Sequence, residues 1–195
     1  MLKKIWVSVA LACAAVGASA ETLDFNDLGT TGFVTVPQDY AGLTWDNFFA
    51  VGKDSYYGPY GDGVVSGSHA ISNSSGGSAS FSSATAFTLD SLYLTKVYFS
   101  GTTTIQAYDG GVLVATKEVA LNAGTPTLVQ FDDWGPLLVN KIVISGGDSS
   151  AQVVIDDISF GSAAVSPVPL PASGLLLGAG LLGMLGVQRR KRCAA

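Results

Sequence analysis

The chain has 195 residues and a formal net charge of −5, and its two cysteines, Cys13 and Cys193, stand near its ends. The central residues 21–161 contain all fifteen acidic residues against four lysines and no arginine, which gives this part a charge of −11. This balance excludes a nucleic-acid partner, whose phosphates need Lys and Arg. The lack of cysteine there excludes an intramolecular disulfide and thiol catalysis.

The first twenty residues have the pattern of a signal peptide. A pair of lysines precedes the apolar run Ile5–Val16, and the small residues Ala18 and Ala20 follow it. This pattern predicts that signal peptidase cleaves after Ala20, so that the mature chain begins at Glu21. Lipidation at Cys13 is the alternative, although the residue three positions before it is alanine where a lipobox usually has leucine.

Residues 21–161 consist of short β-forming runs separated by Gly, Ser, Asn and Asp. The runs predict ten strands, at Thr22–Phe25, Leu43–Phe49, Ala79–Phe81, Ala86–Leu89, Leu92–Phe99, Thr103–Tyr108, Val112–Val119, Thr127–Phe131, Lys141–Ser145 and Gln152–Phe160. Asp109-Gly110-Gly111 supplies the positive φ of a tight hairpin. Tyr56–Gly63 and Ser66–Ser78 are interpreted as loops. Strands of this length and spacing predict an all-β, jelly-roll-like β-sandwich of one domain.

The aromatic residues are candidates for sugar binding. Alternation in Leu43–Phe49 places Leu43, Trp45, Asn47 and Phe49 on one face, and we expect Trp45 to belong to the core. A loop rich in Gly and Pro carries three further tyrosines, which are the predicted ligand-binding residues: Tyr56, Tyr57 and Tyr60.

Catalytic groups are few. His69 is the only histidine, so a histidine metal cluster is excluded, and we expect it to be a solvated loop residue. The carboxylate pairs Asp132-Asp133 and Asp156-Asp157 are adjacent in sequence, and neighbours in a strand point to opposite faces unless a bulge intervenes. We therefore expect a protein that is not an enzyme, and the alternative is a secreted hydrolase acting on surface polysaccharide.

The C-terminal segment has three parts after a small-residue linker at 162–167. A proline-stiffened motif comes first, then the uncharged run Ala172–Val187, then a basic cluster. The sixteen apolar residues would span about 24 Å as a helix, which is barely enough to cross a membrane. The motif is Val168, Pro169, Leu170, Pro171 and Ala172, and the basic cluster is Arg189, Arg190, Lys191 and Arg192.

This tail, residues 168–192, resembles the PEP-CTERM sorting signals, and in particular their Val-Pro-Leu-Pro-Ala variant; the commoner version has glutamate at the position of Leu170. The resemblance implies a transmembrane sorting helix, handling by an exosortase-type membrane peptidase, transit through the inner membrane, and a final place at the cell surface or outside the cell. An ordinary C-terminal membrane anchor is the alternative.

The ends of the central domain carry a second resemblance. Leu23-Asp24-Phe25-Asn26-Asp27 opens the domain, Tyr40–Phe48 follows it, and Ile155–Phe160 closes it. This layout resembles the galactose-binding-like jelly rolls of carbohydrate-binding modules, in which the first and last strands are neighbours. The expected function is an exported cell-surface or extracellular-matrix protein that binds carbohydrate.

The same layout predicts a calcium site. Alternation in the last strand places Val154, Asp156, Ile158 and Phe160 on one face, and its apolar members indicate the core. A buried carboxylate needs a partner, and Ca²⁺ takes its ligands from oxygen atoms. We therefore expect a structural Ca²⁺ ligated by Asp156 with Asp24 or Asp27. The alternative is a solvated or backbone-bonded Asp156.

Overall fold

The computed structural model describes residues 21–29, 32–54, 58–146 and 151–161. The chain divides into two units, Met1–Ala164 and Val165–Ala195, and the second lies wholly outside the described residues. The predicted signal peptide, the linker and the sorting signal at 168–192 lie outside them as well. Within the described ranges, no helix has the length and apolar character needed to cross a membrane.

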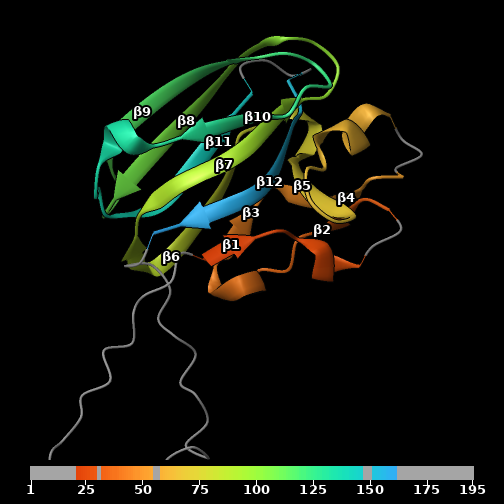
Figure 1. Cartoon of the computed structure of the whole chain (residues 1–195). Helices are drawn as coiled ribbons and strands as arrows, with labels where there is room; N and C mark the ends of the chain where they lie inside the picture. Colours follow the sequence, from red (N-terminus) through yellow and green to blue (C-terminus); the bar gives the residue numbers. More distant parts are fainter. Residues whose placement is uncertain (1–20, 30–31, 55–57, 147–150, 162–195) are drawn as a thin grey trace, which may run out of the picture. The chain divides into compact units, whose positions relative to one another are not determined.

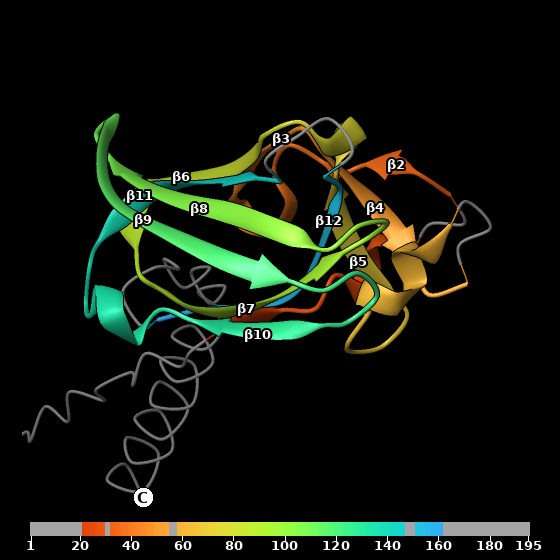
Figure 2. The same ribbon diagram turned by 90° about the horizontal axis from the view of Figure 1, so that it is seen from above.

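The described residues form two sheets that pack face to face as a β-sandwich (Figures 1 and 2), as predicted. All pairings between these strands are antiparallel. The seven-stranded sheet has the order β10 (Thr127–Gln130), β7 (Leu89–Lys96), β12 (Val153–Phe160), β5 (His69–Asn73), β4 (Phe48–Gly52) and β2 (Val34–Thr35), with β1 (Glu21–Leu23) also paired to β12. The five-stranded sheet has the order β3 (Thr44–Asp46), β6 (Ala79–Phe87), β11 (Val139–Ser145), β8 (Gly101–Asp109) and β9 (Val112–Leu121).

Five short 3-10 turns connect the strands, and the described residues contain no α-helix. The turns are η1 (Asn26–Leu28), η2 (Tyr40–Gly42), η3 (Pro59–Gly63), η4 (Ser74–Gly76) and η5 (Asp132–Trp134). The predicted hairpin is confirmed, because Asp109 pairs with Val112 and both intervening glycines have positive φ. That geometry suits the right-handed twist of the flanking strands.

The main core lies between the two sheets. It receives alternate side chains from both, such as Ile105 and Ala107 of β8 and Leu92 and Leu94 of β7. Phe81 of β6 lies in the middle of this core. Its ring centroid is 5.3 Å from that of Trp45, 6.0 Å from Phe87 and 5.9 Å from Phe160. The prediction that Trp45 is a core residue is confirmed.

Two predicted strand boundaries are wrong for local backbone reasons. The predicted strand Leu43–Phe49 divides into β3 and β4 at Asn47, whose φ of 60° lies in the left-handed region. The break shifts the alternation, so that Trp45 and Phe48 are both buried in the main core. Conversely, the predicted strand Ala79–Phe81 and the first two residues of the predicted strand Ala86–Leu89 belong to one strand, β6, although a polar Ser/Thr-rich stretch separates its apolar ends. Leu89 begins β7.

Strand β5 lies inside Ser66–Ser78, which was interpreted as a loop, and that interpretation is wrong. The polar side chains of Ser72 and Asn73 in this strand are fully buried but have partners. The Ser72 hydroxyl donates to the carbonyl of Val153 at 2.9 Å, and the Asn73 side-chain oxygen accepts the N–H of Val153 at 2.7 Å. A central strand can therefore be polar where each buried group finds a hydrogen bond.

Strand β12 contains a bulge that the simple alternation did not predict. Asp157 has a φ of 46°, and the register with β7 shifts between Asp156 and Ser159. Val153 and Ile155 before the bulge, and Ile158 and Phe160 after it, all reach the main core, whereas Val154 belongs to a second apolar cluster. The prediction that residues 154, 156, 158 and 160 share one face is therefore wrong.

The central place of Phe81 leads to a stability prediction. Phe81→Ala in the mature protein should lower the free energy of unfolding by about 3–5 kcal/mol, because it leaves a cavity among three aromatic rings. Urea denaturation followed by circular dichroism measures this change. The matched control is Phe99→Ala, which truncates a ring that is 69% exposed and should change stability by less than about 0.5 kcal/mol. Equal effects of the two substitutions would contradict the assigned core.

Candidate functional site

A second apolar cluster lies on the outer face of the seven-stranded sheet, beneath η3. Its buried members are Val51, Tyr60, Val64, Ala70, Val97 and Val154. The turn lies very close to the sheet. A Cβ added to Gly63 would be 2.4 Å from the Cβ of Val154, so a glycine is required there. This close packing fixes the position of η3 on the sheet and makes it a platform for the residues around it.

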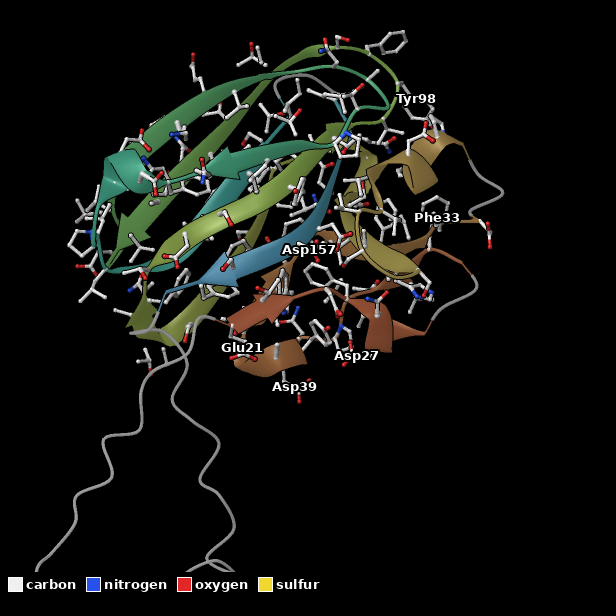
Figure 3. The ribbon with its side chains drawn as sticks, in the orientation of Figure 1. Glu21, Asp27, Phe33, Asp39, Tyr98 and Asp157 are labelled. Atoms are coloured by element: carbon white, nitrogen blue, oxygen red, sulfur yellow. The ribbon has the colours of Figure 1, made fainter. Side chains whose placement is uncertain are left out.

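Four aromatic side chains around η3 form what we call the aromatic patch: Phe33, Phe49, Tyr60 and Tyr98. The ring of Tyr60 lies between the others, with its centroid 5.1 Å from Phe33, 5.9 Å from Phe49 and 6.0 Å from Tyr98. Phe33 is 40% exposed and Tyr98 is 45% exposed, whereas Tyr60 is 4% exposed. Figure 3 shows Phe33 and Tyr98 on the side of the domain away from Glu21. The patch thus presents two exposed rings supported by a buried one.

Polar contacts position the tyrosines of the aromatic patch. The Tyr60 hydroxyl donates to the side-chain oxygen of Gln152 at 2.5 Å, and burial raises the pKa of Tyr60 above its ordinary value. Tyr60 therefore stays a protonated donor. A Cβ at Gly58 would lie 3.0 Å from the Tyr98 hydroxyl, so the backbone passes close to that ring. The patch is held in place before any ligand arrives, which reduces the entropy lost on binding.

Of the three predicted ligand-binding tyrosines, the structure describes only Tyr60. Tyr56 and Tyr57 lie outside the described residues. Tyr60 belongs to the patch, but its ring is buried and supports the exposed rings. Sequence reasoning missed Phe33 and Tyr98. Phe33 follows a glycine in an apparent turn, and Tyr98 was assigned to a strand that ends at Lys96. Only their long-range contacts with Tyr60 identify them.

Asp156 is fully buried, and its partners are backbone groups. Its Oδ2 accepts the N–H of Val65 at 2.7 Å and of Ser66 at 3.0 Å, and its Oδ1 accepts the N–H of Asp157 at 2.8 Å. Burial, which outweighs these three bonds, raises the pKa of Asp156 to about 6. The prediction that Asp156 is buried is confirmed. Its carboxylate, however, faces the loop between η3 and β5 and not the main core, so it lies on the face of the strand opposite to the predicted one.

The three predicted calcium ligands have separate protein partners. Asp24 accepts the N–H of Asn26 at 3.2 Å, and Asp27 accepts the hydroxyl of Tyr40 at 2.6 Å. The expected pairing of the first and last strands is confirmed, since Leu23 pairs with Ile158. Within the described ranges, no three His, Cys, Asp or Glu side chains gather into a group that could hold a metal ion. Asp156 is backbone-bonded, as the alternative stated, and calcium binding stays a prediction.

The other candidate catalytic groups take part in local contacts. Asp133 forms an ion pair with Lys117 at 2.6 Å, which lowers the pKa of its carboxyl group. The Asp157 carboxylate accepts the Ser66 hydroxyl at 2.6 Å. His69 is half-buried at the start of β5, with its Nδ1 2.8 Å from the Ser68 hydroxyl, so the prediction of a solvated loop histidine is wrong.

Comparisons with known proteins give separate findings for the C-terminal tail and for the β-sandwich domain. The described domain is an all-β sandwich of two antiparallel sheets. Residues 167–191 match the PEP-CTERM protein-sorting motif, so the chain carries the sorting signal of an exported protein. A search of curated proteins finds no match.

Several solved structures have a similar arrangement of strands. The family 32 carbohydrate-binding module of C. perfringens NanJ, in complex with galactose, is 16% identical with a TM-score of 0.36, over 60% of this chain and 98% of that one. TmCBM61 in complex with β-1,4-galactotriose is 12% identical with a TM-score of 0.37, over 68% and 99%. The tandem CBM22 domain of Paenibacillus barcinonensis Xyn10C is 14% identical with a TM-score of 0.42, over 82% and 49%.

The raised pKa of Asp156 leads to a prediction about pH. The folded state binds this proton more tightly than the unfolded chain, whose aspartate pKa is near the ordinary value of 3.8. The contribution of Asp156 to the free energy of unfolding should therefore fall as the pH rises from about 4 to about 6, and stay constant above. Carbon-detected NMR titration should show its midpoint near pH 6. A midpoint at or below 4 would contradict the burial of this carboxylate.

Proposed function

We propose that the protein is an exported cell-surface or extracellular-matrix component that is processed by an exosortase and binds a neutral polysaccharide through the aromatic patch. The sorting motif supports the first half of this proposal. The observation that carries the second half is the exposure of Phe33 and Tyr98 on either side of the buried Tyr60 ring. An exposed cluster of rings, held by buried contacts, is a feature of an interaction site.

The chemistry of the aromatic patch favours a sugar polymer. The C–H faces of pyranose rings pack on flat aromatic side chains, while the tyrosine hydroxyl offers a polar handle beside them. The ring centroid of Tyr60 is 5.1 Å from that of Phe33 and 6.0 Å from that of Tyr98. The two exposed rings are therefore no farther apart than the sum of these distances, so one oligosaccharide can contact both. The charge of −11 on residues 21–161 disfavours an acidic polymer. The ligand class is therefore a neutral glycan.

Ligand binding can be tested by truncating the exposed rings. Tyr98→Ala and Phe33→Ala in the mature protein should each weaken binding to neutral polysaccharide by about two- to twelvefold, because one aromatic contact contributes about 0.5–1.5 kcal/mol. Affinity electrophoresis in gels containing xylan, galactan, glucan or a polyuronate measures the change. Phe99→Ala, the neighbouring exposed ring outside the patch, is the matched control. Wild-type protein that is retarded by none of these gels, or only by the polyuronate, would overturn the proposed ligand.

Processing is tested separately by mass spectrometry of the protein recovered from its native envelope. The mature chain should begin at Glu21, after signal peptidase cleavage, and should end near Pro171, because the exosortase removes the apolar and basic parts of the tail. Protein that still carries Arg189 to Arg192 in a wild-type envelope would contradict removal of the tail. The same protein from a strain that lacks the exosortase is the control.

A further inference from the structure

We propose that Asp156 and Asn26 are positioning residues of the aromatic patch, which they hold in place through the loop that joins η3 to β5. This inference rests on the proposed function for its binding consequence. The loop, residues 64–68, directly follows the turn that carries Tyr60, and it lies on the outer face of the seven-stranded sheet. Asp156 comes from β12 and Asn26 from η1, so two separate elements hold one short segment.

The first anchor is the carboxylate of Asp156. It accepts the N–H groups of Val65 and Ser66 on one oxygen and its neighbour's N–H on the other. The adjacent Asp157 adds a bond from the Ser66 hydroxyl. The bulge in β12 creates this arrangement, because it places two consecutive carboxylates within reach of the same loop. The backbone N–H groups of Val65 and Ser66 find their acceptor in this carboxylate, so these bonds keep the loop closed.

The second anchor is the side chain of Asn26. Its oxygen accepts the N–H of Ser68 at 2.6 Å and the N–H of His69 at 3.3 Å. Gly67 has a φ of 59°, and a Cβ there would be 2.0 Å from the Asn26 oxygen. The loop therefore passes directly over Asn26, which only a glycine permits. The two anchors act on opposite ends of the same five residues.

A short chain of contacts links the anchored loop to the aromatic patch. Val64 precedes the anchored amides and packs in the second cluster with Tyr60. Its own N–H donates to the carbonyl of Gly61, and Gly63 lies against Val154. If Val65 and Ser66 are released, Val64 and Gly63 lose their place on the sheet, and Tyr60 loses the support that holds it between Phe33 and Tyr98.

The main core should tolerate this release. It lies on the other face of the seven-stranded sheet, and none of the residues 64–68 belongs to it. Loosening the loop is therefore a local opening of the kind that hydrogen exchange detects, and the sandwich itself stays folded. This separation distinguishes a positioning role from a general contribution to stability.

The test uses the mature protein with three substitutions: Asp156→Asn, Asn26→Ala and Gly67→Ala. Asparagine at 156 directs an NH₂ group at backbone donors, alanine at 26 removes the second acceptor, and alanine at 67 collides with Asn26. Amide exchange of Val65, Ser66 and Ser68 should become at least about tenfold faster, while exchange in β8 and β11 stays unchanged. Ring signals of Tyr60 and Tyr98 in NMR spectra should shift, and polysaccharide affinity should fall as in Tyr98→Ala.

Two controls separate the possible results. Asn26→Asp keeps the acceptor oxygen and should restore slow exchange at Ser68, whereas Asp133→Asn removes an exposed carboxylate elsewhere and should change none of these signals. Faster loop exchange with unshifted Tyr60 and Tyr98 signals would overturn the positioning role. So would unchanged exchange in both Asp156→Asn and Asn26→Ala. If the wild type binds no polysaccharide, the proposed function fails, and the ring signals still decide whether the anchors position the patch. If Asp156→Asn does not fold, Asn26→Ala, at a half-buried position outside the main core, carries the test.

Discussion

The bulge at Asp156 and Asp157 is the constraint on which both apolar layers of this domain depend. Strand β12 lies inside the seven-stranded sheet, with the main core on one side and the second cluster on the other. A regular strand could continue one alternation only, and would direct either Ile158 and Phe160 or Val153 and Ile155 away from the core. The bulge changes the phase, so all four reach the core. It also leaves a carboxylate on the outer face, where backbone N–H groups of a loop surround it.

Much of the fold could be predicted because most strands obey the period of two. The β8–β9 hairpin followed from its glycines, and the pairing of β1 with β12 followed from the overall layout. Strand β5 could not be predicted, because Ser72 and Asn73 are polar and only their bonds to Val153 make them acceptable inside a sheet. Left-handed residues such as Asn47 and Asp157 shift the alternation. Asn and Asp are enriched at positive φ, but such residues are uncommon overall, so the residue type alone does not mark the position.

The candidate site was predicted only in part, for a related reason. The loop rich in Tyr and Gly was identified, and Tyr60 does belong to the aromatic patch. Phe33 and Tyr98 are far from it in sequence, and they join it because β2, β4, β7 and η3 meet at one place. Asp156 was correctly predicted to be buried, but it was assigned to the core face of β12 and lies on the outer face. A carboxylate among apolar neighbours does indicate burial, but the alternation alone cannot show which layer buries it.

The composition of the domain explains why backbone groups satisfy its buried carboxylate. Residues 21–161 contain no arginine and only four lysines, and Lys117 is paired with Asp133 at the surface. Peptide N–H groups donate strong hydrogen bonds to an ionised carboxylate, so they can hold it in a buried place without a side-chain cation. The cost is that the loop which supplies them must stay in place. In this protein that loop is continuous with the turn beneath the aromatic patch, so the same hydrogen bonds that satisfy Asp156 also hold the exposed rings in a fixed geometry. An exposed surface made of rings suits a domain of this charge, because packing on aromatic faces requires none of its few cations.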